Sequence, residues 1–398
     1  MLRSLYSGIS GLRAHQTMLD VTANNIANVN TTAFKSSSAQ FQDTLSQLTH
    51  GAGSPQTVVG GTNPAQVGLG VQVAGISTNF AQGSTQSTGR ATDMMISGDG
   101  FFVTQLAGQT LYSRAGAFDF DAQGRLVSPS GALVQGWNAD AAGTVNQGGA
   151  LGTITLPLTT IQPPLASAKA TVTGNLPADA APDATVVREF TAYDKTGAAI
   201  QVSLTFKNTA AIGVAPTWSV SSPSSTDTPL LTFAGGVMTS TPNKFTATVN
   251  GVDIDVDLST ISGAAKLSVL TATSTDGHAA GSLTSFTLGA DGTLTGLFSN
   301  GKQQSIGRIA LATFTNPGGL EKAGSSEYRS TTNSGTAVLG AAGSAGMGTL
   351  TSGSLEMSNV DLSQEFTNLI VAQRGFQANA RIITTSDEVL TELTNLKR

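Results

Sequence analysis

Apolar residues follow a helical period at the two ends of the chain and a strand period between them. Near each terminus they recur every seven positions, and gaps of three and four place them along one narrow stripe of a helix. Such a stripe packs against other helices rather than against a sheet. The predicted packing residues are Leu5, Ile9, Leu12, Leu19, Ile26, Leu362, Phe366, Leu369, Phe376, Ile383 and Leu390.

Polar residues interrupt these stripes at Gln16, Gln373 and Asp387. In coiled coils, polar residues at such positions set the register and the number of partners at some loss of stability. We therefore assign register setting to these three residues. Because an isolated helix has nothing to bury its stripe against, partner helices are required. Packing between copies of the chain is favoured over the alternative, an ordinary helical hairpin within one chain.

The C-terminal helix also carries a start signal. Ser358 and Asp361 have the spacing of a capping box, with Asp in place of the usual Glu. The helix is therefore predicted to begin near Ser358, although the seven-residue row of apolar positions extends back to Leu355.

Between the ends, Gly and Pro separate short alternating segments that are typical of strands and turns. Asn250-Gly251 lies between two such segments and predicts a hairpin with a type I′ turn. The predicted fold class is multidomain α+β, with long terminal helices pairing as a coiled-coil-like core and all-β outer domains inserted between them. The predicted parts are an N-terminal helix (1–30), a linker or extended arm (31–66), a discontinuous inner β domain (67–146 plus 281–350), an inserted outer β domain (147–280) and a C-terminal helix (351–398).

Composition narrows the classes of function. The 398 residues carry a net charge of −5, and only 11% are charged, where about 25% is usual. The chain has no basic run, which argues against nucleic-acid binding. No apolar run reaches the roughly 18 residues of a membrane span, so we expect no membrane insertion. The absence of Cys excludes disulfides and thiolate chemistry.

Candidate catalytic and metal-binding residues are few. The three histidines are too scattered in the sequence for a triad or a metal site, so we predict no catalytic residue, no cofactor and no metal ligand. Asp253, Asp255 and Asp257 alternate along a predicted strand and would share one face. A weak cation site is the alternative there, but a solvated strand face is favoured.

Two terminal segments carry a resemblance to a known family. ANNIANVNTTAFKS at 23–36 and SGSLEMSNVDLSQEFTNLIVAQRGFQANARIITTSDEVL at 352–390 resemble the paired motifs of bacterial flagellar rod and hook axial proteins. The segment at 67–103 and LYSRAGAFDFD beyond it resemble the next domain of the hook members. Two positions depart from the family pattern: Ala33 stands where Gly often precedes Phe-Lys, and Gly375-Phe376 replaces a polar-aromatic pair. Residues that match family motifs, implied to act as caps and inter-helix hydrogen bonds, are Asn24, Asn25, Asn28, Phe34, Arg374 and Asn379.

The resemblance implies a structural role without enzymatic activity. Members polymerise helically into the curved, hollow hook, a universal joint that transmits motor torque from rod to filament. The implied partners are copies of the chain itself, the distal rod protein, the hook cap protein, the hook-filament junction protein and the flagellar type III export apparatus. The implied location is extracellular, after export without a cleaved signal peptide. A distal rod or hook-filament junction protein is the alternative, although the large middle unit favours the hook over the shorter distal rod. A cation-binding secreted β protein is a remote alternative.

Overall fold

The computed structural model of the chain describes residues 2–57, 60–140, 143–157, 161–211, 214, 217–223, 225, 228–240, 243–274, 276–344 and 346–395. Within them the fold is mostly β, with a long helix near each terminus: α1 (Leu2–Ala27) and α2 (Leu362–Asn395). The chain divides into two units, the first comprising Met1–Leu156, Thr287–Thr295 and Ser305–Arg398, the second Pro157–Phe286 and Gly296–Gln304. Neither described helix is long and apolar enough to cross a membrane.

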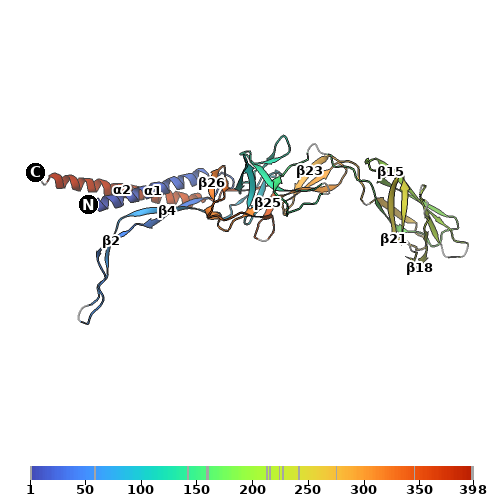
Figure 1. Ribbon diagram of the computed structural model, residues 1–398, viewed down its shortest axis with the longest axis horizontal. Helices are drawn as coiled ribbons and strands as arrows, with labels where there is room; N and C mark the ends of the chain where they lie inside the picture. The colour runs from blue at the N-terminus through green and yellow to red at the C-terminus, as the bar shows by residue number, and fades with distance from the viewer. Residues whose placement is uncertain are drawn as a thin grey trace. The chain divides into compact units, whose positions relative to one another are not determined.

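In the first unit, α1 and α2 lie side by side, with the described start of α1 near the described end of α2 (Figure 1). Asp361 caps α2, because its Oδ1 accepts hydrogen bonds from the backbone N–H of Ser363 at 2.8 Å and of Gln364 at 3.2 Å. The predicted start near Ser358 is therefore wrong. Leu355 lies in a strand, β30 (Ser354–Glu356), because its backbone pairs with β5 (Thr85–Ser87) and so cannot continue the helix.

The segment predicted as a linker or extended arm forms an arm, and its strands are paired. β1 (Ser37–Asp43) pairs antiparallel with β4 (Val71–Thr78), and β2 (Ser46–His50) pairs antiparallel with β3 (Ala65–Gly68). The arm therefore extends to Thr78, beyond the predicted boundary at 66. Its base is fixed to α1, since the Ser10 hydroxyl accepts a hydrogen bond from the Val71 N–H at 3.2 Å. Farther out the arm projects from the helices (Figure 1), and Leu48 is 56% exposed.

The inner β domain of the first unit is built around one antiparallel sheet. Strands follow the order β25-β11-β7-β8-β27-β26. Its core contains Phe101, Tyr112, Trp137, Phe314 and Tyr328. The bounds are β6 (Met94–Ser97), β7 (Phe101–Leu106), β8 (Gln109–Ser113), β9 (Asp119–Phe120), β10 (Leu126–Val127), β11 (Leu133–Asn138), β12 (Gly152–Thr153), η1 (Pro317–Gly319), β26 (Glu321–Gly324), β27 (Glu327–Arg329), β28 (Val338–Ala341) and β29 (Thr349–Ser352).

The second unit has two four-stranded sheets that share one apolar core. Their strand orders are β20-β21-β13-β22 and β14-β15-β16-β17. The core draws on both sheets and includes Phe206, Trp218 and Val256. The bounds are β13 (Lys169–Asn175), β14 (Thr185–Tyr193), β15 (Ala199–Asn208), β16 (Trp218–Ser221), β17 (Leu230–Leu231), β18 (Phe233–Ala234), β19 (Val237–Met238), β20 (Lys244–Val249), β21 (Val252–Ser262) and β22 (Val269–Ser274).

The boundaries of the second unit differ from the predicted 147–280. The unit begins at Pro157, because β12 pairs with β11 and Ile154 donates its N–H to Val134 O at 3.0 Å. Gly296–Gln304 also belongs to it. Three strands contain the remaining boundaries between the units: β23 (Leu283–Leu288), β24 (Thr293–Phe298) and β25 (Gln303–Thr313).

The predicted hairpin at Asn250-Gly251 joins β20 to β21, and both residues have positive φ, 52° and 77°. A type I′ turn requires positive φ at both central positions. On β21, Asp253 accepts a hydrogen bond from the Thr248 hydroxyl at 2.7 Å, and Asp255 accepts one from Thr246 at 3.1 Å. These carboxylates thus lie on an outer strand face beside hydroxyl donors.

Candidate functional site

The two helices approach each other at glycines rather than at leucines. A Cβ placed on Gly11 would lie 2.7 Å from Oδ1 of Asn379, closer than side-chain atoms can approach. A Cβ placed on Gly8 would lie 3.4 Å from Cγ2 of Ile382. Glycine at these positions therefore permits the close approach of the helix backbones.

The contacts give the helix pair an antiparallel register. The His15 ring lies against Gly375, where a Cβ would be only 2.5 Å from its Cε1. Farther along α1, Asn25 Nδ2 donates to Glu365 Oε1 at 2.9 Å. The contacts pair Gly8 with Ile382, Gly11 with Asn379, His15 with Gly375 and Asn25 with Glu365. Each step forward along α1 therefore matches an equal step backward along α2. His15 also meets the arm, since its ring makes an edge contact with Phe41 at 6.0 Å between centroids.

Among the predicted packing residues, Ile383 reaches this contact, with Cγ1 3.5 Å from a Cβ placed on Gly8, but none of the predicted residues is among the buried positions of the two helices. The buried helix positions are small, polar or charged: Gly8, Gly11, Ala14, Thr22, Asn25, Glu365, Ala372 and Ser386. The predicted apolar positions that are half-buried are Leu5, Ile9, Leu12, Leu19, Ile26, Leu369, Phe376, Ile383 and Leu390. Leu362 and Phe366 are 40% and 52% exposed. The predicted positions Phe366, Gln373 and Asp387 are thus each displaced by one position from the buried residues Glu365, Ala372 and Ser386.

The predicted register-setting residues Gln16, Gln373 and Asp387 are all exposed in the single chain. Within the α1–α2 pair, the register is instead constrained by the glycine contacts. The role assigned to the three residues remains a prediction about contacts with other copies.

Motif residues near the end of α1 hold the helix to its surroundings. Asn28 Nδ2 donates to Asn24 Oδ1 at 2.7 Å and to Asn24 O at 2.9 Å at the helix terminus. Asn25 exchanges two hydrogen bonds with the backbone of Ser37, at 2.7 and 3.0 Å, in addition to its bond to Glu365. One amide side chain thereby links α1, β1 and α2.

The remaining motif residues have different environments. Phe34 lies under the ammonium of Lys322, 5.2 Å from the ring centroid. Asn379 Nδ2 donates to Gly375 O at 2.9 Å within α2. Arg374 is exposed.

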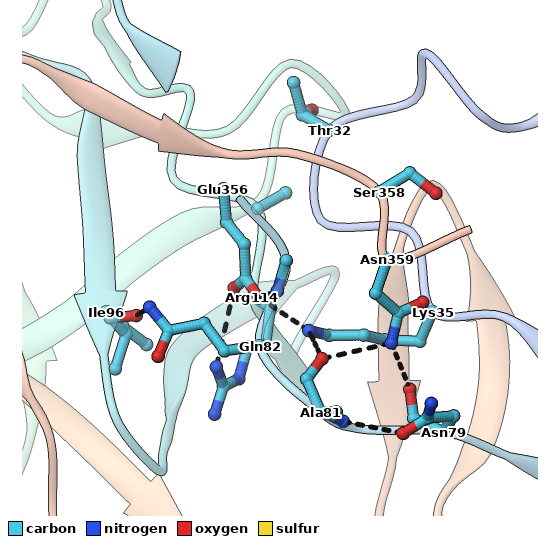
Figure 2. Close-up of polar contacts among 12 residues, drawn as sticks. Thr32, Lys35, Asn79, Ala81, Gln82, Ile96, Arg114, Glu356, Ser358 and Asn359 are labelled. Atoms are coloured by element: carbon cyan, nitrogen blue, oxygen red, sulfur yellow. Dashed lines mark hydrogen bonds and ion pairs between the residues drawn. The ribbon is translucent and has the colours of Figure 1, made fainter. Parts of the chain in front are cut away.

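A buried ionic cluster lies where the chain leaves α1 and where it approaches α2 (Figure 2). Lys35 Nζ lies 2.6 Å from Glu356 Oε1, and both side chains are fully buried. Glu356 Oε1 also accepts the Gly83 N–H at 2.8 Å, while Oε2 lies 3.4 Å from Arg114 Nη1. Lys35 donates a second hydrogen bond, to Ala81 O at 2.9 Å. We call Lys35, Arg114 and Glu356 the ionic junction.

Backbone contacts reinforce the ionic junction. Ala33 N–H donates to Glu356 O at 2.8 Å, and Ser36 N–H donates to Asn359 Oδ1 at 2.8 Å. The Asn359 amide donates in turn to Asn79 O and Ala81 O at 2.8 and 3.0 Å (Figure 2). Ala33 is fully buried with φ of 56°, a left-handed conformation that glycine adopts more easily. The position noted as usually glycine is therefore one at which the backbone favours that residue.

Burial perturbs two titratable groups at the junction. Desolvation lowers the pKa of Lys35, and its hydrogen bond and attraction to Glu356 oppose the change. Desolvation raises the pKa of Tyr328 to about 12. This ring packs against Phe80 and Phe101, with centroid distances of 5.3 and 6.0 Å.

Lys35, Arg114, Glu356 and Asn359 are not among the site residues predicted from the sequence. All four lie inside the quoted motifs, in AFKS, LYSRAGAFDFD and LEMSN, so residues of opposite charge were available as a signal. Among the described residues, no group of three or more His, Cys, Asp or Glu side chains could hold a metal ion.

Comparison with known proteins agrees with this arrangement. Three family models match: "Flagella basal body rod protein" at residues 5–35, "Flagellar hook protein FlgE/F/G D1 domain" at 95–174 and "Flagellar basal body rod FlgEFG protein C-terminal" at 351–396. The flagellar hook protein FlgE of Borreliella burgdorferi is 38% identical over 444 aligned residues that cover 100% of both chains. The chain belongs to the flagellar hook protein family.

Other relatives refine this family assignment. The flagellar basal-body rod protein FlgG of Bacillus subtilis is 35% identical, again over 100% of both chains. The expectation that rod relatives are considerably shorter is therefore wrong for this rod protein. The crystal structure of Helicobacter pylori flagellar hook protein FlgE2 shares the fold with a TM-score of 0.51 and 15% identity, covering 67% of this chain and 98% of that one.

The ionic junction should contribute strongly to the stability of this hook-family chain. Glu356→Gln keeps the shape of the side chain but leaves Lys35 and Arg114 buried without a counter-charge, so the free energy of unfolding should fall by about 3–5 kcal/mol. Trp137 fluorescence would report the transition of the first unit in a Trp218→Phe background. The matched control is Asp119→Asn, which removes an exposed pair with Arg90 and should cost less than about 1 kcal/mol. Equal costs for the two variants would contradict a structural role for the junction.

Gly375→Ala tests the contact with His15. Helix propensity alone predicts a gain of about 1 kcal/mol, whereas the clash with the His15 ring predicts a loss of about 1–3 kcal/mol. We expect the loss, measured as thermal unfolding of the helical circular dichroism signal, and its recovery in the His15→Ala/Gly375→Ala double variant. Gln377→Ala, at an exposed site on α2, serves as the control. A stabilised single variant would show that the helices do not meet in this register.

Tyr328 should make stability depend on alkaline pH. The pKa of Tyr328 is about 12 in the folded chain and about 10 in the unfolded chain. Its contribution to the free energy of unfolding is therefore complete below about pH 10 and decreases as the pH rises from about 10 to 12. Tyr328→Phe should remove up to about 3 kcal/mol of that decrease, measured by denaturant unfolding across this range. A smaller slope remains from Tyr112, whose pKa burial also raises. Tyr6→Phe, at a 66% exposed position, should leave the profile unchanged. If the free energy of unfolding of Tyr328→Phe depends on pH as that of the parent does, burial does not raise the pKa of this phenol.

Proposed function

We propose that the chain is a structural subunit of the bacterial flagellar hook, in which copies polymerise helically into a curved, hollow tube. In this function it acts as a universal joint that transmits torque from rod to filament. Full-length similarity to proteins named flagellar hook protein supports this proposal. The observation that carries it at the residue level is the apolar surface of α2.

The exposed side of α2 is unusually apolar for a helix in water. Its exposed large apolar side chains, at 40% to 54%, are Leu362, Phe366, Ile370, Val371, Ile382, Val389 and Leu393. The α1–α2 contact uses mainly small and polar positions, with Ile382 at its edge beside Gly8, so these side chains stay partly exposed in the single chain. Leu362, Phe366 and Ile370 follow one another at steps of four residues and so share one face of the helix, and exposed apolar surface of this kind marks protein interfaces. Burying one Phe or Ile side chain is worth about 1.5–3 kcal/mol, which favours association over exposure.

A second copy of the chain is the occupant we assign to this surface. Helices of neighbouring copies would pack through the apolar stripes as a coiled-coil-like inner core, with Gln16, Gln373 and Asp387 setting the register between copies. The β units would then lie outside that core. Family resemblance extends the proposed contacts to the distal rod protein, the hook cap protein and the hook-filament junction protein. It also supports export through the flagellar type III apparatus without a cleaved signal peptide, to an extracellular position in the hook.

A rod subunit is the second candidate. The Bacillus subtilis rod protein matches the whole chain at an identity close to that of the hook relatives, so chain length does not separate the two functions. Expression of the chain in a hook-deficient strain and in a rod-deficient strain separates them. Restored hooks in the first strain alone support the proposal, whereas restoration of the second strain alone assigns the chain to the rod.

Charges placed on the exposed surface of α2 should block polymerisation without unfolding the chain. Phe366 and Ile370 are 52% and 54% exposed, so Phe366→Asp/Ile370→Asp should change the stability of the monomer little. It should raise the critical concentration for polymerisation by more than about tenfold, because it removes two buried apolar contacts per copy. Light scattering of purified chain in sulfate, which strengthens apolar burial, measures this change.

The control for this experiment is Gln377→Asp, which adds a charge at an exposed polar position of the same helix. It should polymerise as the parent does. Tubes of normal critical concentration from the double variant would rule out this surface as the interface between copies.

A further inference from the structure

A cavity lies beside the ionic junction. Its volume is about 410 Å³, and its lining includes Arg114, Asp99, Thr313 and three aromatic rings, Phe80, Phe101 and Phe314. A volume of this size is within the range of small-molecule pockets, about 300–1,000 Å³. All of these residues belong to the first unit.

The cavity lining holds two charged residues, Arg114 and Asp99, and of these Arg114 is buried. Its side chain is 3% exposed. Nη2 donates to Gly98 O at 2.8 Å and Nη1 to Glu356 Oε2 at 3.4 Å, but Nε has no hydrogen-bond partner among the described residues. A buried guanidinium N–H without an acceptor costs free energy, so an acceptor beside it would be stabilising.

The charges of the ionic junction do not balance. It holds two cationic side chains, Lys35 and Arg114, and one carboxylate, Glu356. Glu356 is shared by Lys35, Arg114 and the Gly83 N–H. Positive charges therefore outnumber negative ones by one within the junction, and the carboxylate of Asp99 on the cavity lining is exposed to water, so it offsets this buried charge only weakly. An anion in the adjacent cavity would supply the missing charge.

The aromatic lining limits which anion fits. Phe101 meets Phe80 and Phe314 edge to face, with centroid distances of 5.6 and 5.8 Å. The guanidinium carbon of Arg114 lies over the Phe101 ring, 5.6 Å from its centroid, and the three rings offer apolar area to a ligand. The exposed carboxylate of Asp99 would repel a doubly charged ligand more than a singly charged one. We propose that this cavity binds a monovalent organic carboxylate, with the Arg114 guanidinium as its donor and the three phenylalanines around its apolar part.

Phenylacetate and its neutral isostere phenylacetamide test the proposal on full-length, unassembled chain. Ligand-observed NMR and calorimetry should show saturable binding of phenylacetate, and binding of the amide at least tenfold weaker. Asp99→Asn removes the repelling charge and should tighten phenylacetate binding about two- to fivefold. Asp43→Asn, which neutralises an exposed carboxylate on the arm, should leave the affinity unchanged.

Arg114→Lys keeps the positive charge but removes Nε, and it should weaken phenylacetate binding more than tenfold if the variant folds. The test does not depend on that variant, because Asp99→Asn and the amide leave the ionic junction intact. Absence of saturable binding, equal affinity for acid and amide, or an affinity unaffected by Asp99→Asn would each overturn the proposal.

A carboxylate could reach the cavity free in solution or on an acidic side chain of a neighbouring copy. Titration of assembled polymer separates these sources. Retained phenylacetate binding after assembly supports a ligand from solution, whereas binding by the monomer that is lost on assembly assigns the same chemistry to a side chain of a second copy.

Discussion

The buried pair of Lys35 and Glu356 is the contact on which the rest of the first unit depends. It joins a residue just beyond α1 to a residue just before α2, although 321 positions separate them. Both charges are fully buried, so neither is stable without the other. The ionic junction can therefore form only when both ends of the chain and the inner β domain are together. Arg114 and the Gly83 N–H bring that domain to the same carboxylate.

The geometry of the helix pair follows from this fixed point. Of these helix contacts, the one between Asn25 and Glu365 lies nearest in sequence to the ionic junction. The antiparallel register continues from there through Gly375 and Gly11. Glycine at the contact brings the backbones close but buries little apolar area. The larger side chains consequently lie to the sides, where Phe366 is 52% exposed. A pair built this way leaves larger apolar side chains of α2 partly exposed, whereas a leucine seam between α1 and α2 would have buried them.

Much of the fold could be predicted because the relevant signals are local. The seven-residue periodicity marks both helices, and Asn250-Gly251 fixes a hairpin because few other residues adopt two successive positive φ values. Contacts between distant segments could not be predicted in this way. Leu355 continues the helical row in sequence, but pairing with β5 makes it a strand. The arm contains Gly and Pro typical of linkers, yet its strands pair with each other.

At the helix contact, too, the sequence pattern predicts the helices but not which residues touch across them. A heptad pattern ranks positions by hydrophobicity, so it selects Phe366 and passes over its neighbour Glu365, which contacts α1. The departure from the family pattern at Gly375 has a reason only once His15 is seen against it, since a Cβ there would lie 2.5 Å from Cε1 of that ring and the ring would have to shift. Sequence position therefore identifies the helices but not the face on which they meet. That face is determined by steric fit and by one buried amide, and both become visible only in three dimensions.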